Sequence, residues 1–173
     1  FNGLDTPCYI VDESLLIKNL EILKSVENRT GCHILLAQKG FSMYIVYPLI
    51  GKYLSGVTSS SLFEARLGFE EMGKEVHIYS PAYKESEFDE ILKYCGHIVF
   101  NSFSQFQKYK KRIQSFEKKI EIGIRVNPEY SEIETDIYNP CSENSRMGVT
   151  LKNFQKDVDI YGMEGIDGIH FHT

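Results

Sequence analysis

Short apolar segments alternate with amphipathic segments along most of this chain, and no other feature of the sequence restricts the fold as strongly. Each apolar segment has the composition of a β-strand and is bounded by Gly, Pro, Ser or Asn. The six segments lie at residues 34–38, 56–59, 76–80, 98–101, 121–127 and 168–172. Strands that alternate with helices in this way predict a parallel sheet, either in a (β/α) barrel of the TIM type or in an open doubly wound sheet.

Amphipathic helices are expected between these strands, at about 42–54, 61–72, 84–95, 103–117 and 151–161. The second of them has a capping-box pattern from Ser61 to Glu64 at its start and Gly73 directly after its end. Residues 6–12 are also strand-like and precede a helix expected at about 13–28. We expect this leading strand to join a C-terminal β-domain supplied by a distant part of the protein.

The carboxyl ends of the six strands favour the barrel. Polar residues able to take part in chemistry stand at every one of these ends: Lys39, Thr58 to Ser61, Ser80, Asn101, Asn127 and His172. In a TIM barrel this rim forms the active site. No GxGxxG follows the first strand and no GxxxxGK[ST] occurs, so the two nucleotide-binding alternatives lack their main sequence support.

Length indicates how much of a barrel is present. Eight βα units need roughly 250 residues, whereas the sequence has 173. We therefore expect an α/β fold, a (β/α)8 TIM-type barrel with only about six βα units. The expected organisation is a leading strand and helix over 1–28, a partial barrel over 29–173, and a C-terminal β-domain outside this sequence.

Composition limits the classes of partner. The formal net charge of −5 at pH 7 disfavours a nucleic acid or an anionic membrane, because both need a basic face on the protein. The cysteines show no CxxC pair and no Cys/His cluster, which fits reduced thiols in a cytoplasmic protein. No apolar stretch is long enough to span a bilayer. The sequence begins with Phe1, so a removed signal peptide is left open.

Lys39 ends the first apolar strand, directly before Gly40. A lysine held in an apolar environment loses its proton readily and becomes a nucleophile. The alternative is a lysine that extends from the strand end into solvent. The polar residues at the other five strand ends favour the nucleophile, because they place Lys39 on a rim suited to chemistry.

Two histidines and an arginine complete the candidate rim. His170 and His172 are two residues apart in a strand and therefore face the same side. Three interpretations are open. The histidines could form a metal-ligand pair, one of them could pack flat against an aromatic cofactor held by Lys39, or both could be hydrogen-bonded core residues. The metal site needs further ligands, and none stands out at the other strand ends. Arg146 lies in a long irregular stretch at about 128–148. An arginine there could bind a phosphate, phenolate or carboxylate group, and the alternative is an ordinary surface arginine.

Several segments resemble the fold-type III pyridoxal-phosphate enzymes, which comprise alanine racemase and the ornithine, diaminopimelate and arginine decarboxylases. The segments are Thr6–Asp12, Ile34–Phe41, Ser59–Gly68, Tyr79–Lys84, Ile98–Gln105, Ile124–Pro128, Ser145–Val149 and Gly168–Thr173. Within this family the chain looks most like the decarboxylases of the carboxylated polyamines carboxynorspermidine and carboxyspermidine. The segments that contain Lys39 and His172 carry the resemblance most specifically.

The resemblance implies roles for individual residues. Lys39 would form the covalent bond to the aldehyde of pyridoxal 5′-phosphate, and His172 would stack on its pyridine ring, so both would be catalytic as well as cofactor-binding. Arg146 falls where relatives place a basic residue near the phenolic oxygen of the cofactor. Glu64 matches an acidic residue of the decarboxylases and receives no role. The implied reaction is loss of carbon dioxide from a small-molecule polyamine in polyamine biosynthesis.

The resemblance also implies a homodimer with a shared active site. The phosphate-binding loop and the acidic partner of the ring nitrogen would come from later strands, and the remaining catalytic residues from a C-terminal domain. Three alternatives stay open: a diaminopimelate or other basic amino-acid decarboxylase, a non-catalytic pyridoxal-phosphate-binding homeostasis protein, and a metal-dependent hydrolase. A full-length protein much longer than a single barrel would favour a decarboxylase over the homeostasis protein.

Overall fold

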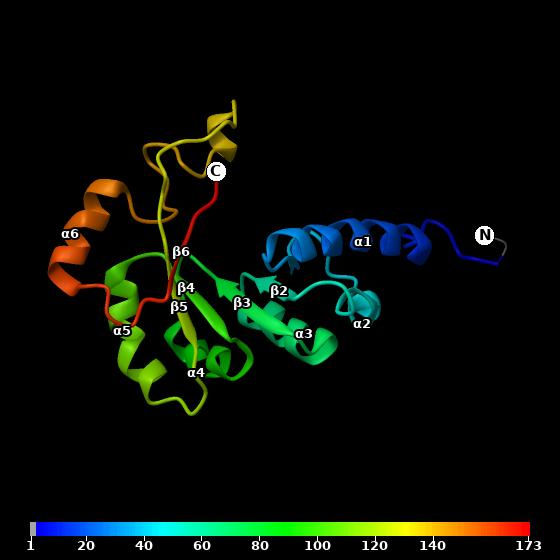
Figure 1. Cartoon of the computed structure of the whole chain (residues 1–173), viewed down its shortest axis with the longest axis horizontal. Coiled ribbons are helices and arrows are strands. Elements are labelled where there is room, and N and C mark those ends of the chain that lie inside the picture. Colours follow the sequence, from blue (N-terminus) through cyan, green and yellow to red (C-terminus); the bar gives the residue numbers. More distant parts are fainter. Residues whose placement is uncertain (1–2) are drawn as a thin grey trace.

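Six parallel strands form one sheet in the computed structural model, which describes residues 3–173 (Figure 1). The strands are β1 Leu35–Ala37, β2 Gly56–Ser59, β3 Glu75–Tyr79, β4 His97–Phe100, β5 Glu121–Arg125 and β6 Gly168–His170. All six strands predicted between residues 34 and 172 are confirmed. Most of them differ from the predicted ranges by one or two residues at an end.

The strand order distinguishes the two expected architectures. The order is β1-β2-β3-β4-β5-β6, so each strand pairs with the next strand along the chain and every pairing is parallel. A doubly wound sheet reverses its order at a switch point, whereas a barrel does not. The sheet is therefore part of a (β/α) barrel, as the polar strand ends predicted.

Helices connect the strands and lie along the sheet (Figure 1). They are α1 Glu13–Thr30, α2 Tyr47–Ile50, α3 Leu62–Met72, α4 Glu85–Tyr94, α5 Phe103–Gln114 and α6 Leu151–Tyr161, with 3-10 turns η1 Tyr44–Val46 and η2 Asp136–Tyr138. The continuous helix predicted at 42–54 is wrong: η1 and the single turn α2 occupy this segment. Pro48 has no N–H group to bond to the carbonyl four residues earlier, so one regular helix cannot continue through it.

Side chains fix the starts of α3 and α5 in the same way. Ser61 accepts a hydrogen bond from Glu64 N at 3.3 Å, and the Glu64 carboxylate accepts one from Ser60 N at 2.6 Å. At α5, Ser102 accepts from Gln105 N at 3.2 Å, and Gln105 Oε1 accepts from Asn101 N at 2.9 Å. Both arrangements extend the capping box by one residue and hold the loop directly after a strand. Glu64 thus has a structural role.

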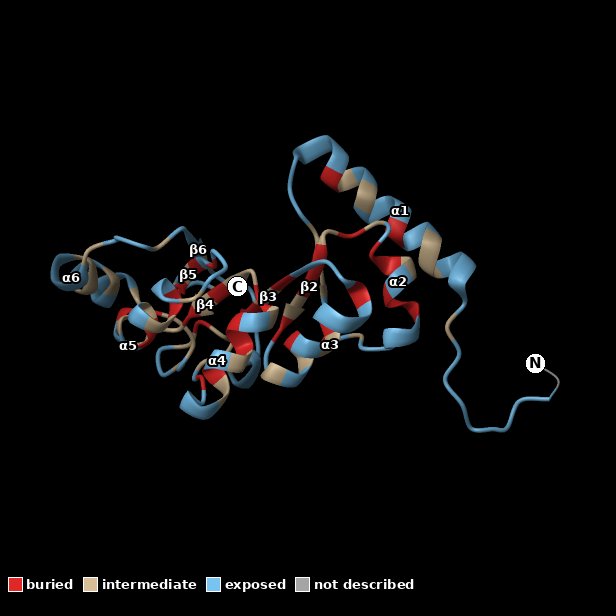
Figure 2. Cartoon of the chain, turned by 90° about the horizontal axis from the view of Figure 1, so that it is seen from below, coloured by how far each residue is buried: buried red, intermediate tan, exposed pale blue. Residues whose placement is uncertain are grey.

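The core lies on one face of the sheet, where helices cover it (Figure 2). The fully buried residues of this layer include Val57, Ile78, Ile98, Phe100 and Ile124 from the strands, and Phe88, Phe103, Phe106 and Tyr109 from the helices. The rings of Phe88 and Tyr109 stack with centroids 3.9 Å apart, which joins α4 to α5. This packing fixes the strand ends in space.

Gly68 brings α3 close to the sheet. A Cβ atom at this position would lie 2.3 Å from Val57 Cγ2 of β2. Glu27 joins α1 to the start of β1 in a different way: its carboxylate accepts hydrogen bonds from Ile34 N at 2.6 Å and from Ser55 Oγ at 2.8 Å. These bonds, together with Lys24, lower the pKa of Glu27 to about 2.

The leading segment at 6–12 forms no strand within the described residues, contrary to its strand-like pattern. It precedes α1 at the end of that helix farther from the sheet, where no strand edge is available for pairing (Figure 1). Tyr9 and Ile10 are exposed there. Its pairing with a C-terminal domain stays a prediction. Asp12 ends the segment and caps α1 by accepting from Ser14 N at 2.8 Å.

Candidate active site

A cleft of about 660 Å³ lies at the carboxyl ends of β1, β5 and β6, and it brings the three predicted cofactor-binding residues together. Its lining consists of Lys39, Arg125, Ile137, Tyr138, Asn139, Pro140, Ser142, Asn144, Ser145, Arg146, Met147 and His172. Lys39, Arg146 and His172 come from three segments far apart in the sequence. Their meeting in one cleft is the result that the barrel prediction required.

Lys39 owes its direction to its neighbour Gln38. Gln38 is buried on the helix side, where its amide nitrogen donates to Ser59 Oγ and to Glu64 O, each at 2.8 Å. Tyr47 donates to Gln38 Oε1 at 3.2 Å. Directly after β1 the chain turns, and Lys39 lines the cleft. The anchored glutamine therefore sets the position of the lysine.

The expectation of a desolvated lysine is wrong for the described residues, because Lys39 is exposed. Its strand lies at an edge of the sheet, and the face beyond it carries no covering element among residues 3–173. The burial inferred from the apolar run applies to Gln38, not to Lys39. The sequence thus predicted the position of the lysine correctly and its exposure incorrectly.

Arg125 supplies a second cation to the cleft from inside the sheet. It is buried, with an exposed fraction of 6%, and its guanidinium carbon lies 4.6 Å from the ring centroid of Tyr79. A guanidinium over an aromatic face is stabilised by the ring quadrupole. Sequence reasoning gave Arg125 no role. The available signal was an arginine that directly follows the apolar residues of β5.

His170 lies next to the Tyr79 ring and has a ring nitrogen without a hydrogen-bond partner among the described residues. Its ring centroid is 5.2 Å from that of Tyr79, and its Nδ1 atom is buried without a hydrogen-bond partner among the described residues. Burial, together with the charges of Arg125, His172 and Lys39, lowers the pKa of His170 to about 4. The ring is therefore neutral at pH 7 and does not add to the positive charge of the cleft.

His172 follows β6 by two residues and lines the cleft. Its side chain is exposed, while its backbone oxygen accepts a hydrogen bond from the Cys141 thiol at 3.2 Å. Cys141 is buried. This contact holds the end of the chain segment after β6 against the loop that carries Arg146.

Asn101 fixes the loop that carries Arg146. Its amide nitrogen donates to Arg146 O at 2.9 Å, and its amide oxygen accepts from Gly148 N at 2.7 Å and from the Tyr79 hydroxyl at 2.8 Å. Gly148 has φ +82°, and a Cβ atom there would lie 2.8 Å from the backbone carbon of Val126. The exposed Arg146 side chain therefore extends from a backbone held at two points. Sequence reasoning placed Asn101 at a strand end but did not anticipate this role.

The donor set suits a planar, anionic ligand with an electrophilic carbon. The cleft offers one amine from Lys39, two guanidinium groups from Arg125 and Arg146, and the imidazole of His172. Guanidinium groups bind phosphate and phenolate oxygens, and an amine can attack a carbonyl carbon. None of the lining residues that the structure describes is acidic. Among the described lining residues, His172 therefore has no carboxylate partner with which to hold a metal.

Known proteins share both the sequence and the fold. No protein-family profile matches the chain. The carboxynorspermidine/carboxyspermidine decarboxylase of Campylobacter jejuni is 43% identical over all 173 residues, which cover 43% of that protein. The carboxyaminopropylagmatine decarboxylase of a Synechocystis species is 40% identical over 148 residues, 86% of this chain and 38% of that protein. The chain thus spans well under half the length of these curated relatives.

Solved structures agree with this likeness. Carboxynorspermidine decarboxylase from Campylobacter jejuni, complexed with norspermidine, superposes with a TM-score of 0.85 at 40% identity, covering 98% of this chain and 41% of that one. Diaminopimelate decarboxylase from Helicobacter pylori, complexed with L-lysine, gives a TM-score of 0.79 at 21% identity, covering 98% and 45%. At that identity the second likeness shows the fold alone. The sheet described above corresponds to the barrel-like domain of these decarboxylases.

Proposed function

We propose that this chain, a homologue of part of the carboxynorspermidine/carboxyspermidine decarboxylases, forms the cofactor-binding barrel of a pyridoxal-5′-phosphate-dependent decarboxylase that acts on a carboxylated polyamine. One observation carries the proposal: Lys39, Arg146 and His172 line a single cleft at the carboxyl ends of the strands. No helix in the described part of the chain is long and apolar enough to cross a membrane.

Each residue of the cleft has a task in this proposal. Lys39 holds the cofactor through its aldehyde, and His172 packs against the ring. Arg146, on the loop that Asn101 fixes, neutralises the phenolic oxygen. The bound cofactor supplies an electron sink for the pair of electrons left when carbon dioxide departs. Arg125, anchored on Tyr79, adds positive charge at the inner wall of the cleft.

His170 supports the site by staying neutral. Its lowered pKa, about 4, means that protonation does not place another positive charge beside Lys39 and Arg125 at neutral pH. Its buried Nδ1 atom has no hydrogen-bond partner among the described residues. A neutral ring with one free nitrogen can accept or donate one hydrogen bond without changing the charge of the site.

The substrate assignment rests on the relatives and on the charge of the cleft. Two arginines and a lysine suit the carboxylate of the substrate, whereas its ammonium groups need acidic partners. The described lining provides none, so the polyamine chain would be recognised by residues elsewhere in the full-length protein. We extend the proposal to a cytoplasmic homodimer with a shared site, as the resemblance implies.

Steady-state kinetics on the full-length protein test the substrate. The panel contains carboxynorspermidine, carboxyspermidine, carboxyaminopropylagmatine, diaminopimelate and ornithine, and the readout is kcat/KM, because discrimination lies in that ratio. We expect the first two to have the highest values. Carboxyaminopropylagmatine is the second candidate, favoured by the 40% identity to the decarboxylase named for it. A higher value for diaminopimelate or ornithine would contradict the polyamine assignment, and absence of decarboxylation with all five would contradict the activity.

A further inference from the structure

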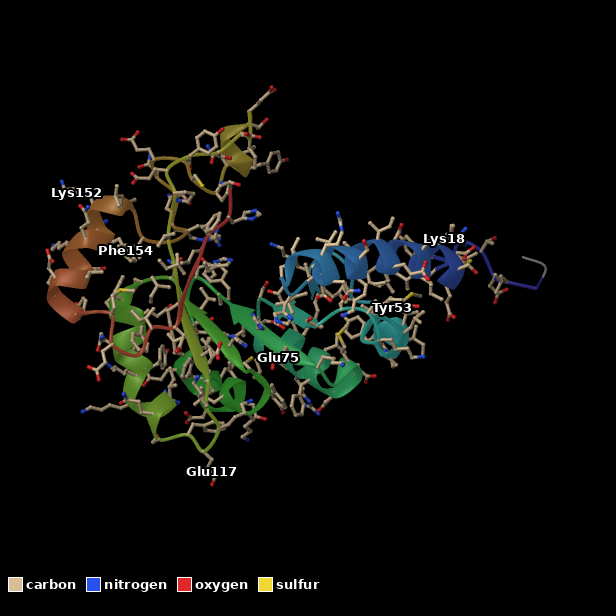
Figure 3. All side chains as sticks on the ribbon, viewed as in Figure 1. Lys18, Tyr53, Glu75, Glu117, Lys152 and Phe154 are labelled. Atoms are coloured by element: carbon tan, nitrogen blue, oxygen red, sulfur yellow. The ribbon has the colours of Figure 1, made fainter. Side chains whose placement is uncertain are left out.

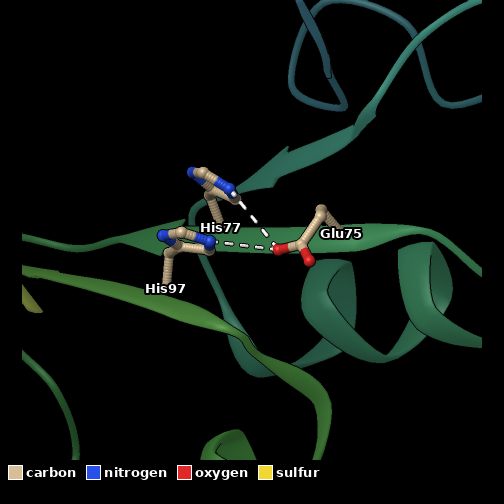
Figure 4. A group of neighbouring side chains, drawn as sticks. All are labelled: Glu75, His77 and His97. Atoms are coloured by element: carbon tan, nitrogen blue, oxygen red, sulfur yellow. Dashed lines mark ion pairs between the residues drawn. The ribbon is translucent and has the colours of Figure 1, made fainter. Parts of the chain in front are cut away.

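A second cluster of chemically capable side chains lies at the amino ends of β3 and β4, away from the cleft (Figure 4). Glu75, His77 and His97 each offer one metal-ligand atom, and these atoms lie within 4.8 Å of one another. Glu75 and His77 are two residues apart on β3, so they share a face of the sheet. His77 pairs in register with His97 of β4, which places the two imidazoles side by side.

In this cluster Glu75 pairs with His97 and leaves His77 without a hydrogen bond to either residue. His97 Nε2 lies 3.1 Å from Glu75 Oε2, but His77 Nε2 lies 3.8 Å from the same oxygen, too far for a hydrogen bond. The two imidazole rings stack with centroids 3.8 Å apart at an angle of 19°.

A second carboxylate orients His97. Glu121 Oε2 lies 3.3 Å from His97 Nδ1, on the opposite side of the ring from Glu75. A neutral imidazole carries one N–H group, which can serve only one of these two carboxylates. When Nδ1–H donates to Glu121, the lone pair of Nε2 lies in the plane of the ring on the side of Glu75. Carboxylate–histidine pairs of this kind orient metal ligands in known sites.

We propose that Glu75, His77 and His97 bind a Zn²⁺ ion through three protein ligands, with Glu121 orienting His97 and water completing the coordination. Zinc prefers imidazole nitrogens and carboxylate oxygens at about 2.0–2.2 Å, which in a tetrahedron separates the ligands by about 3.3 Å. The separations of 3.1 and 3.8 Å are close to that value. The opening beside Gly96, where a Cβ atom would lie 3.1 Å from Glu75 Oε2, leaves room for the carboxylate.

The location assigns this ion a structural task. The amino-terminal face of a barrel contributes to stability rather than to catalysis. An ion held by β3 and β4 would fasten two neighbouring strands at the end where no cofactor binds. Bound zinc should therefore raise the melting temperature of the protein, and the rise should continue as free Zn²⁺ exceeds its dissociation constant, while the cleft and its chemistry stay in place.

Equilibrium dialysis of the chelator-treated, full-length holoenzyme against buffered Zn²⁺, followed by elemental analysis, tests the proposal. We expect one equivalent of zinc in the wild type, lost or bound at least tenfold more weakly in His77→Gln and His97→Gln. Glu75→Gln, a change at an exposed carboxylate, should weaken binding about tenfold. His33→Gln, which alters a nearby exposed histidine, is the matched control and should retain the full equivalent. Equal zinc content in the wild type and the three cluster variants, or no zinc in the wild type, would overturn the proposal.

Cobalt(II) provides a readout that does not depend on the variants. Co²⁺ replaces Zn²⁺ in sites of this type, and its visible absorption is strong only in tetrahedral or five-coordinate environments. We expect the wild-type protein and the His33→Gln control to give these bands at one equivalent of Co²⁺, and Zn²⁺ to displace them. A weak octahedral spectrum from the wild type, or bands that Zn²⁺ does not displace, would contradict the proposed zinc site.

Discussion

The two faces of the sheet use the same strands for different purposes. On the helix-covered face, Val57, Ile78 and Ile98 are buried among aliphatic and aromatic side chains (Figure 2). The opposite face carries His77, Tyr79 and Arg125 from the same or neighbouring strands, and the candidate groups described above lie there or at its rim. Glu75, which begins β3, is labelled in Figure 3. Because side chains alternate along a strand, one short segment can serve both faces. The first face makes the fold and the second makes the sites.

The largest effect should come from the rim of the second face. Lys39→Ala should reduce kcat by about 10³-fold or more, because it removes the amine that holds the cofactor. Steady-state decarboxylation by the full-length protein measures this. The melting temperature should change little, since Lys39 is exposed. Lys74→Ala, at another exposed lysine, is the control and should retain activity. A Lys39→Ala enzyme with near-normal kcat would contradict the claim that the chemistry depends on this rim.

The next effect contrasts neighbouring residues of β4. Ile98 is fully buried on the helix-covered face, and Val99 is half-buried on the other. Ile98→Ala should lower the free energy of unfolding by about 2–5 kcal/mol, because it leaves a cavity in the core. Val99→Ala should cost about 1 kcal/mol. Urea titrations of the two full-length variants measure the difference, and equal losses would show that both faces contribute alike to the core.

Asn101 tests whether the loop with Arg146 depends on its anchor. Asn101→Ala removes three hydrogen bonds and should lower the free energy of unfolding by about 1–3 kcal/mol. Cofactor affinity, measured by titration of the absorption spectrum, should fall with it. Asn101→Asp retains the two accepted bonds and loses only the donation to Arg146 O, so its loss should be smaller. The idea fails if both variants bind the cofactor as tightly as the wild type does.

The smallest effect is a dependence of stability on pH, which we assign to two histidines on the face that helices do not cover. His77 and His170 both have folded-state pKa values near 4, below the ordinary value of 6.5. The unfolded chain therefore binds more protons than the folded chain between these values, and stability falls as pH drops from about 6.5 to about 4. Melting temperatures across this range measure the slope. His170→Gln should flatten it, whereas Lys74→Ala, at an exposed lysine that does not titrate in this range, should leave it unchanged; a steeper slope in His170→Gln would contradict the assignment.

Much of the fold was predictable because local pattern and tertiary structure agree. Each strand is a short apolar segment between turn residues, and Ser61 and Ser102 cap the helices that follow β2 and β4. The prediction of one helix at 42–54 was wrong because it rested on the amphipathic pattern alone, which takes no account of the missing N–H group of Pro48. The segment at 6–12 has the alternation of a strand, but a strand also needs a neighbour, which local sequence does not reveal.

The meeting of the candidate residues in one cleft was predictable, and their environment was less so; their roles stay predictions. Lys39, Arg146 and His172 could be chosen because strand ends and an irregular segment meet on one rim of a barrel. The exposure of Lys39 depends on elements far away in sequence, so the apolar run before it gave the wrong answer. Arg125 and Asn101 were missed because their roles arise from contacts with Tyr79 and with the loop. His77 and His97 become neighbours only through the register of β3 and β4.

Chemical labelling tests whether Lys39 holds the cofactor. The full-length protein is reduced with borohydride in the presence of pyridoxal 5′-phosphate, digested and analysed by mass spectrometry. We expect one modified peptide, which contains Lys39, and no modified lysine elsewhere in the digest at comparable yield. A label on a different lysine, or the absence of any label, would contradict the assignment of Lys39 and of the cleft around it.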